Sequence, residues 1–251
     1  MINTTTDPKR LHMNKPDFKD LIVFEDEDYV LINKPPHVAT LDERTADNPF
    51  SILRMAKAYI SDAQVCHRLD KETSGILAIA KNPEAYRHLS MQFEHRQVVK
   101  RYHAVVNGIH DFDSISVYLP IAQLTNGTVK IDRQKGKEAE TIFNSIRAYK
   151  LHTLVNCYPI TGRMHQIRIH LTCLKAPIVG DGQYGGAHAF LSQIKKKFNL
   201  KKDTEEQPLI QRVALHARAL TFTRLNDEEI TVEAPYPKDF EALVRQLEKN
   251  A

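Results

Sequence analysis

Residues 66–80 read CHRLDKETSGILAIA, a short polar cluster followed at once by an apolar run. The apolar part, Ile76–Ala80, lies between a glycine and an Asn-Pro pair, which predicts a buried strand. The polar part places a base (His67), a cation (Arg68) and a carboxylate (Asp70) close together. Because a core strand fixes the residues joined to it, such a cluster is a good support for a catalytic side chain. A surface loop whose charges pair with one another explains the same polar residues equally well.

The composition is that of a globular protein. The chain has 251 residues, of which 42% are hydrophobic and 26% charged, enough for a substantial core. No internal repeat, low-complexity linker or break in composition divides it, so one domain is the simplest account. Lysine and arginine number 35 against 31 aspartate and glutamate residues, and the net charge of +4 is compatible with a polyanionic partner without requiring one.

The cysteines indicate a reducing compartment. Cys66, Cys157 and Cys173 are an odd number, widely spaced and without a C-x-x-C pair, which is typical of reduced thiols in a cytoplasmic protein. The polar N-terminus contains no signal peptide, and no apolar run reaches the length needed to cross a bilayer. We therefore expect a cytoplasmic protein with no membrane association.

Periodicity and turn signals predict strands and helices from residue 21 onward. An apolar hairpin is expected over residues 21–33, with later strands at 98–106, 116–119, 139–149, 219–222 and 230–232. Helices are expected over residues 49–60, from Asn82-Pro83, along the stripe of Ile167, Leu171 and Leu174, and from about Lys238. The prediction is an α+β fold, a single domain over residues 21–251 with an antiparallel or mixed sheet, after a flexible arm over residues 1–20.

Two lysine-containing segments have an open interpretation. Lys34 ends the predicted hairpin, where a solvated lysine is more usual than an RNA or phosphate contact. The segment Lys195–Lys202 carries five lysines before an acidic run, and a solvated loop explains it at least as well as a nucleic-acid patch.

Several common sites are absent from the sequence. There is no H-E-x-x-H, and His165 and His170 are five residues apart, which on a helix separates them by about 140°. Neither a G-x-x-x-x-G-K-[ST] nor a G-x-G-x-x-G motif occurs, so the phosphate cradles of nucleoside triphosphates and dinucleotides are missing. A G-x-S-x-G serine-hydrolase turn is also missing. We therefore expect no zinc site and no nucleotide bound through these motifs.

The remaining candidates are an aspartate in a loop, a tyrosine on a strand and an arginine-rich helix start. A carboxylate near a fixed arginine is held ionised, which suits a nucleophile or an electrostatic stabiliser of a cationic centre. Tyrosine offers a face for stacking on a base and a phenol that relays a proton. Arginines contact phosphates and fill the gap left by an extruded base. Together these residues fit chemistry at a glycosidic bond of RNA.

Six segments carry a resemblance to a known family. They are Asn33-Lys34-Pro35, His67-Arg68-Leu69-Asp70 with Thr73-Ser74-Gly75, Lys100-Arg101-Tyr102, the long run from Pro159 to Leu171, Gly180-Asp181 with Tyr184-Gly185, and Leu215-His216-Ala217. In this order and at this spacing the chain resembles the RluA family of pseudouridine synthases. The resemblance implies the pseudouridine synthase fold, a mixed, mainly antiparallel and bent sheet flanked by helices.

The resemblance also implies an activity, the isomerisation of uridine to pseudouridine in structured RNA without cofactor or metal. Asp70 matches the family's essential aspartate, which acts either on the sugar or by assisting proton removal. Tyr102 matches the tyrosine that stacks on the uracil, and Arg168 the arginine paired with the aspartate. Arg68 matches the arginine that enters the RNA stack when the uridine leaves. Lys100 and Arg163, in the same matching segments, are expected to bind RNA.

The chain departs from the family in two places. After Asn33-Lys34-Pro35, relatives usually continue with a small residue and glycine, but here Pro36-His37 follows, so the shape of that loop is open. Many relatives carry an RNA-binding domain of the S4 type ahead of the catalytic domain, and we expect none here. The expected substrate of this monomer is ribosomal RNA or transfer RNA. An RNA-binding protein without turnover and a hydrolase of the glycosidic bond are the competing hypotheses.

Overall fold

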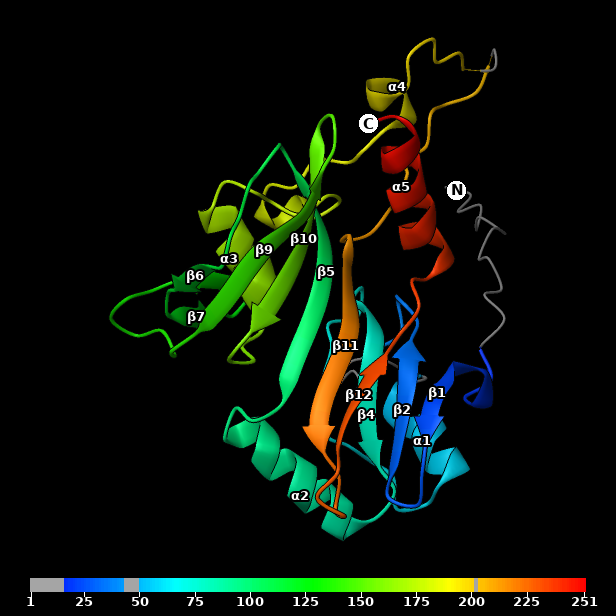
Figure 1. Cartoon of the computed structure of the whole chain (residues 1–251), viewed down its shortest axis with the longest axis vertical. Coiled ribbons are helices and arrows are strands. Elements are labelled where there is room, and N and C mark those ends of the chain that lie inside the picture. The colour runs from blue at the N-terminus through cyan, green and yellow to red at the C-terminus, as the bar shows by residue number, and fades with distance from the viewer. Residues whose placement is uncertain (1–15, 43–49, 201–202) are drawn as a thin grey trace, which may run out of the picture.

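The computed structural model describes residues 16–42, 50–200 and 203–251 (Figure 1). Its strands are β1 (Ile22–Glu25), β2 (Tyr29–Lys34), β3 (Gln64–Val65), β4 (Ser74–Ala80), β5 (Val99–Asn107), β6 (Ile115–Tyr118), β7 (Ile121–Gln123), β8 (Val129–Ile131), β9 (Glu140–Ala148), β10 (His152–Pro159), β11 (Leu215–Thr223) and β12 (Glu229–Glu233). Its helices are α1 (Ile52–Tyr59), α2 (Pro83–Glu94), α3 (Gln166–Cys173), α4 (Leu191–Ile194) and α5 (Lys238–Lys249), with short 3₁₀ turns η1 (Lys19–Leu21) and η2 (Gly182–Tyr184).

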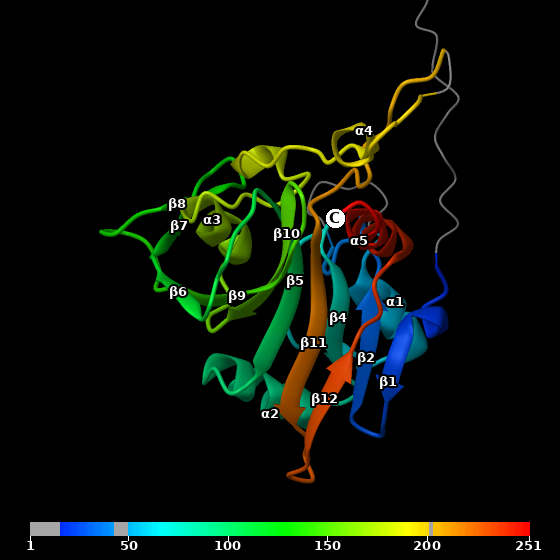
Figure 2. The same cartoon turned by 45° about the horizontal axis from the view of Figure 1, so that its top comes forward.

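One large sheet organises the described residues. Its order is β1-β2-β4-β11-β5-β10-β9-β6, with β3 added to β4 and β12 to β11. Strands β4 and β11 run parallel, whereas every other strand pair in the described part of the chain is antiparallel. Figure 2 shows the sheet curling through β10, β9 and β6 around α3. The predicted α+β fold with a mixed, mainly antiparallel and bent sheet is confirmed.

Gly75 makes the parallel contact between β4 and β11 possible. Its φ is +113°, and a Cβ atom there would lie 2.1 Å from the carbonyl oxygen of Ala217. Only glycine adopts this backbone conformation without strain and leaves room for the neighbouring strand. Because β4 begins one residue earlier, this close approach also sets the position of the polar cluster that precedes it.

The two larger of the three hydrophobic cores among the described residues lie on either side of the centre of the sheet. One is built around β2 and β4 with α1 and α2. The other is built around β5 and β10 with α3 and α5. Tyr102, on the central strand β5, packs against both cores. Packing of apolar side chains in each core therefore fixes the position of β5, the strand at the boundary between them.

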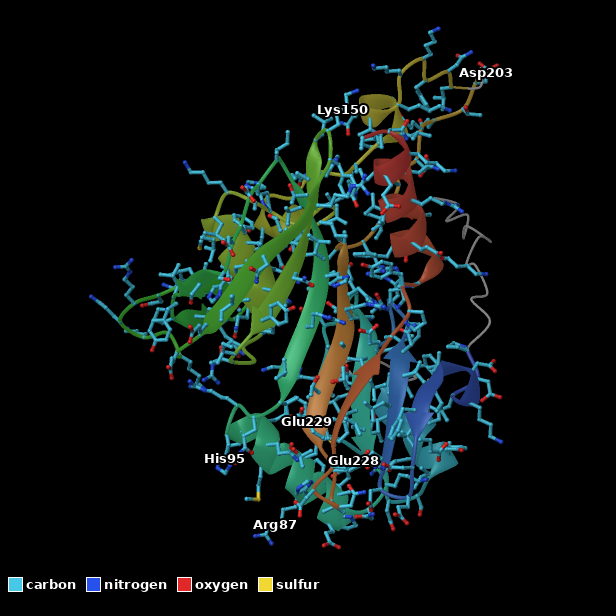
Figure 3. All side chains as sticks on the ribbon, viewed as in Figure 1. Arg87, His95, Lys150, Asp203, Glu228 and Glu229 are labelled. Atoms are coloured by element: carbon cyan, nitrogen blue, oxygen red, sulfur yellow. The ribbon has the colours of Figure 1, made fainter. Side chains whose placement is uncertain are left out.

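Most elements expected from the sequence are present. Strand β4 is buried along its whole length, as its apolar run predicted. Asn82 caps α2 by accepting a hydrogen bond from the Ala85 amide, and Arg87 and His95 point away from the body of the protein (Figure 3). The hairpin β1–β2 and helices α1, α3 and α5 also lie where they were predicted.

Some predictions fall short or fall outside the described residues. The short hairpin β7–β8 was not anticipated, because three-residue strands show no clear alternation. The predicted arm lies largely in residues 1–15, outside the described part, but Phe18 is buried against Tyr59. Lys195, Lys196 and Lys197 are exposed, whereas Lys201 and Lys202 lie outside the described residues. None of the helices that the structure describes is long and apolar enough to span a bilayer.

Candidate active site

The polar cluster forms a loop, residues 66–73, which we call the Asp70 loop. It connects β3 to β4. Side chains of segments that are distant in the sequence hold its backbone in place. The Thr40 hydroxyl donates to the Leu69 carbonyl at 2.9 Å and accepts from the Leu69 amide at 3.2 Å. Both backbone groups of the residue before Asp70 are thus satisfied by one side chain, which restricts the loop to one conformation.

Lys34 is a second anchor of the Asp70 loop, and the prediction of a solvated lysine was wrong. The side chain is fully buried, and its Nζ donates to the carbonyls of Pro35 (3.0 Å), Val38 (2.9 Å) and Lys71 (3.2 Å). Burial, followed by the positive charge of Arg212, lowers the pKa of Lys34 to about 7. The unusual Pro36-His37 turn is thereby tied to the Asp70 loop through a single ammonium group.

Arg212 is the third anchor. It is 1% exposed, pairs with Asp239 of α5 through bonds of 2.7 and 3.0 Å, and donates to the Glu72 carbonyl at 3.0 Å. Buried guanidinium groups are stabilised only when their donors are satisfied, and here backbone carbonyls and a carboxylate satisfy them. The carbonyls of residues 71 and 72 are therefore each held by a buried basic side chain, which fixes the loop just beyond Asp70.

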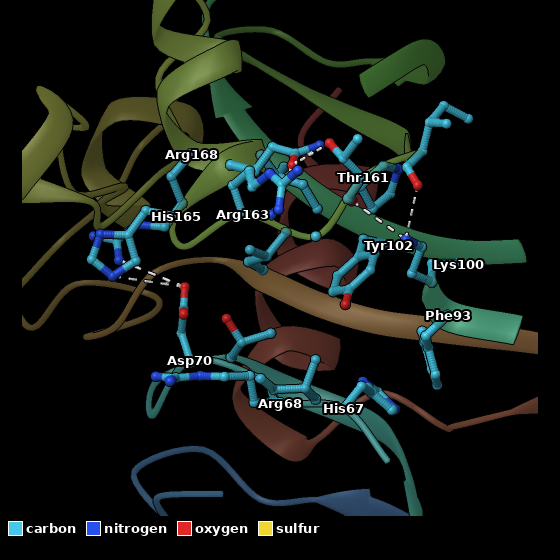
Figure 4. Close-up of a pocket in the computed structure, with 18 of the residues that line it drawn as sticks. His67, Arg68, Asp70, Phe93, Lys100, Tyr102, Thr161, Arg163, His165 and Arg168 are labelled. Carbon is cyan, nitrogen blue, oxygen red and sulfur yellow. Dashed lines mark hydrogen bonds and ion pairs between the residues drawn. The ribbon is translucent and has the colours of Figure 1, made fainter. Parts of the chain in front are cut away.

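The Asp70 loop faces a cavity of about 550 Å³ at the boundary between the two cores. All six site residues expected from the sequence line it, namely Arg68, Asp70, Lys100, Tyr102, Arg163 and Arg168. They come from the Asp70 loop, from β5, from the turn before α3 and from α3 itself, so segments far apart in the chain converge (Figure 4). A cavity of this size is in the range of ligand-binding pockets.

Asp70 and Arg168 face each other, but the arginine has a closer partner. Arg168 Nη1 lies 3.9 Å from Asp70 Oδ2, while Nε and Nη2 each donate to the Asp181 carboxylate at 2.7 Å. Asp181 is 1% exposed, and this bidentate bond fixes the plane of the guanidinium. The pairing expected between residues 70 and 168 is therefore a longer-range attraction, and Asp181 is a partner that the sequence did not reveal.

Tyr102 is partly buried on β5 and points into the cavity (Figure 4). Burial, with a smaller contribution from the negative charge of Asp70, raises the pKa of Tyr102 well above its usual value. The side chain is therefore a neutral phenol, able to donate a proton and to present its ring to a base. It is the aromatic side chain that both cores position.

The three predicted RNA-binding residues differ in their surroundings. Lys100 Nζ donates to the carbonyls of Ile160 (3.2 Å) and Thr161 (3.3 Å), and burial, followed by the charge of Arg96, lowers its pKa to about 8. Arg163 Nε donates to the Glu138 carbonyl at 2.9 Å. Arg68 is exposed beside Asp70. The structure brings all three to the cavity, and their contact with RNA remains a prediction.

His67, named above as a base, has a different role. Its Nε2 accepts a hydrogen bond from the Ala78 amide at 3.0 Å, and its ring packs on Phe93 at 4.7 Å between centroids. Burial lowers the pKa of His67 to about 3, so the ring stays neutral. With its lone pair occupied by strand β4, His67 holds the Asp70 loop against the sheet.

His165 lines the cavity next to Asp70, and Tyr184 packs against His165. His165 Nε2 lies 3.9 Å from Asp70 Oδ2, and its Nδ1 lies 2.8 Å from the Tyr184 hydroxyl. Arg168 stacks over the Tyr184 ring at 4.9 Å. Both residues lie in segments that carry the family resemblance, but residue type alone gave neither a role. Among the described residues, no group of three or more His, Cys, Asp or Glu side chains is placed to hold a metal ion.

Comparison with known proteins gives one consistent result. The family model for RNA pseudouridylate synthase matches residues 28–172. Ribosomal large subunit pseudouridine synthase C of Escherichia coli K12 is 34% identical over 236 residues, covering 91% of this chain and 70% of that protein. An uncharacterised RNA pseudouridine synthase of Zymomonas mobilis is 32% identical over 225 residues, covering 87% of this chain and 94% of that protein.

A solved structure agrees with the sequence relatives. Human RNA pseudouridylate synthase domain containing 4 has a TM-score of 0.67 and 25% identity, covering 92% of this chain and 95% of that one. The family match covers the Asp70 loop, β5 and most of α3, the segments that build the cavity. The chain therefore belongs to the RNA pseudouridylate synthase family, as a catalytic domain of the RluA type, and is an isomerase that forms pseudouridine in RNA.

Proposed function

We propose that this enzyme modifies ribosomal RNA of the large subunit and that Asp70 performs the central step, with Tyr102 and Arg168 as catalytic partners. The observation that carries the proposal is the convergence of these three side chains on one cavity, with Asp70 only 27% exposed and Arg168 Nη1 3.9 Å from it. A carboxylate that faces a guanidinium is suited to act at a ribose carbon or to assist removal of a proton from the sugar.

Each remaining residue has a proposed task at the same cavity. Tyr102 stacks on the uracil and takes part in proton transfer through a phenol that its raised pKa keeps protonated. Arg68, exposed beside Asp70, enters the RNA stack when the uridine is extruded, offsetting an unstacking cost of a few kcal/mol. Lys100 and Arg163, on the opposite wall, contact the RNA backbone.

The RNA target is inferred from relatives. Proteins 34% identical to this chain are named ribosomal large subunit pseudouridine synthases, and they match over about nine-tenths of it. Transfer RNA, the other substrate expected from the sequence, and an RNA-binding protein without turnover predict different outcomes. We further propose a cytoplasmic monomer, consistent with the free cysteines among the described residues, that needs neither metal nor cofactor.

The target is tested by mapping pseudouridines in cells that lack this protein. We expect specific positions in large-subunit ribosomal RNA to lose the modification, to regain it with the parent chain, and to stay unmodified with Asp70→Asn. Loss confined to transfer RNA would contradict the ribosomal target. Loss of no pseudouridine, together with retained RNA binding, would favour the protein without turnover. Purified enzyme is expected to remain fully active after dialysis against a chelator.

A further inference from the structure

His165 has a backbone conformation that few side chains adopt. It lies immediately before α3 with φ 53° and ψ 20°, the left-handed region, and it makes no capping hydrogen bond to the helix. Histidine, like asparagine and aspartate, tolerates this region better than most residues, but the conformation still costs about 1 kcal/mol or more. The ring is only 14% exposed and is directed into the cavity, toward Asp70 (Figure 4).

The hydrogen bonds around Tyr184 determine which nitrogen of His165 carries the proton. The Val129 amide donates a hydrogen bond to the Tyr184 hydroxyl at 3.0 Å. Because this amide is a donor, it cannot accept the proton of the phenol. The other hydrogen-bonding partner of the Tyr184 hydroxyl among the described residues is His165 Nδ1, at 2.8 Å, and it accepts the phenol proton. Burial raises the pKa of Tyr184, which keeps that proton on the phenol. Nδ1 is then the acceptor, and the neutral ring carries its proton on Nε2.

The protonated nitrogen faces the carboxylate that the chemistry needs. His165 Nε2 and Asp70 Oδ2 are 3.9 Å apart, about 1 Å beyond hydrogen-bond length. Hydrogen bonds at active sites are often long without substrate and shorten when it binds. Arg168 Nη1 lies at the same 3.9 Å from Asp70 Oδ2, but its guanidinium is held by Asp181 through Nε and Nη2 at 2.7 Å, which limits its movement toward Asp70.

We infer that His165 is a positioning residue, a neutral donor whose Nε2–H fixes the orientation of the Asp70 carboxylate when RNA is bound. Tyr184 acts through it by holding the required tautomer. A neutral donor orients the carboxylate without adding a full positive charge beside it, so Asp70 remains reactive toward a sugar carbon or proton. The inference rests on the proposed role of Asp70 and adds a part of the site that the family match does not assign.

The charged neighbours of His165 oppose one another. Asp70 and Asp181 favour the protonated ring, whereas burial, Arg168 and Arg68 disfavour it, and burial is the largest effect. The pKa of His165 is therefore lowered, and the ring is neutral at physiological pH. If the ring acted as a cation instead, activity would fall as the pH rises through its pKa. A neutral donor predicts no such loss in the neutral range.

The first test compares three variants of His165 in RNA turnover. His165→Leu removes the donor, and we expect kcat to fall about 10- to 100-fold while KM for RNA changes little. His165→Gln places an amide N–H near the position of Nε2 and is expected to recover most of the loss, with the pH profile of the parent. His165→Asn tolerates the backbone conformation equally well but is too short to reach, so it is expected to behave like His165→Leu.

The second test observes the tautomer without altering His165. In protein labelled with ¹⁵N at histidine, His165 is expected to show the Nε2–H form in the parent and a mixture in Tyr184→Phe. An Nδ1–H tautomer in the parent, or equal activity of His165→Leu and parent, would overturn the inference. If Asp70→Asn is inactive while His165→Leu is fully active, this inference alone fails. If Asp70→Asn is fully active, the proposed role of Asp70 fails instead.

Discussion

At the scale of residues, the buried pair of Arg168 and Asp181 fixes the geometry on one side of the cavity. The two short bonds to Asp181 hold the guanidinium in one plane, with Nη1 aimed at Asp70 across 3.9 Å. Because the Arg168 guanidinium is already paired with Asp181, it attracts Asp70 without a direct hydrogen bond to it. Under the proposed function, this leaves the Asp70 carboxylate free to approach the ribose.

Tyr102→Phe separates the two roles proposed for this side chain. The ring and its stacking surface remain, so RNA affinity should change less than about threefold, whereas loss of the phenol proton should lower turnover about 100-fold or more. Single-turnover rates measure the effect on turnover, and binding assays with the same RNA measure the effect on affinity. Unchanged turnover would mean that the ring alone is needed. Tyr158→Phe on neighbouring β10, absent from the cavity lining, is the matched control.

At the scale of elements, the Asp70 loop is held by its neighbours more than by its own sequence. Lys34 binds the carbonyl of residue 71, Arg212 that of residue 72, and Thr40 both backbone groups of residue 69. The parallel pairing of β4 with β11 then fixes where the loop enters the sheet. An active-site loop built in this way stays in position before RNA arrives, which favours catalysis.

Gly75→Ala should therefore damage both stability and activity. The new Cβ would lie 2.1 Å from the Ala217 carbonyl oxygen at a φ of +113°, so β4 and β11 must separate. We expect the free energy of unfolding to fall by about 3 kcal/mol or more. Gly182→Ala, where the φ is not positive and no atom lies within 4 Å, should change it by less than about 0.5 kcal/mol. Denaturant unfolding of both variants checks the difference, and equal effects would contradict it.

The sequence predicts some of these features and not others, for physical reasons. The strand at 76–80 and the helix after Asn82 are predictable because local periodicity and capping specify them. The burial of Lys34 and Arg212 is not, because their partners are backbone carbonyls brought together by the tertiary fold. For the same reason, residue type indicated Asp70 and Tyr102 but gave no sign that Asp181 would hold Arg168 or that Tyr184 would bind His165.

At the scale of the whole molecule, the cavity lies where two separate cores meet. Each half packs its own helices on the sheet, and β5 with β11 joins them at the centre. Several buried or half-buried histidines of the described residues are neutral in this arrangement. Burial lowers the pKa of His67 and of His216 to about 3, and that of His103 to about 4.

Because the pKa values of these histidines are lowered in the folded protein, we predict that the protein loses stability in mild acid. In the unfolded chain they bind protons below a pKa of about 6.5, whereas in the folded protein they stay neutral until the pH approaches 3 or 4. Between these values the unfolded state binds more protons, so stability is complete above pH 6.5 and falls as the pH drops. His67→Gln keeps an acceptor for the Ala78 amide but does not titrate. Between pH 6.5 and 4.5 the parent should therefore lose more stability than this variant, and the difference in free energy of unfolding should be about 2 kcal/mol. Parallel pH curves would contradict this.

The most direct test of the catalytic centre follows the carbon–carbon bond that isomerisation forms. When the uracil rejoins the ribose through carbon 5, the hydrogen on that carbon is released, so RNA containing [5-³H]uridine reports each turnover as tritium in water. We expect release with the parent enzyme, no detectable release with the isosteric Asp70→Asn, and no free uracil in either case. Release by Asp70→Asn at the rate of the parent would contradict the assignment of Asp70, and free uracil as the product would identify a hydrolase.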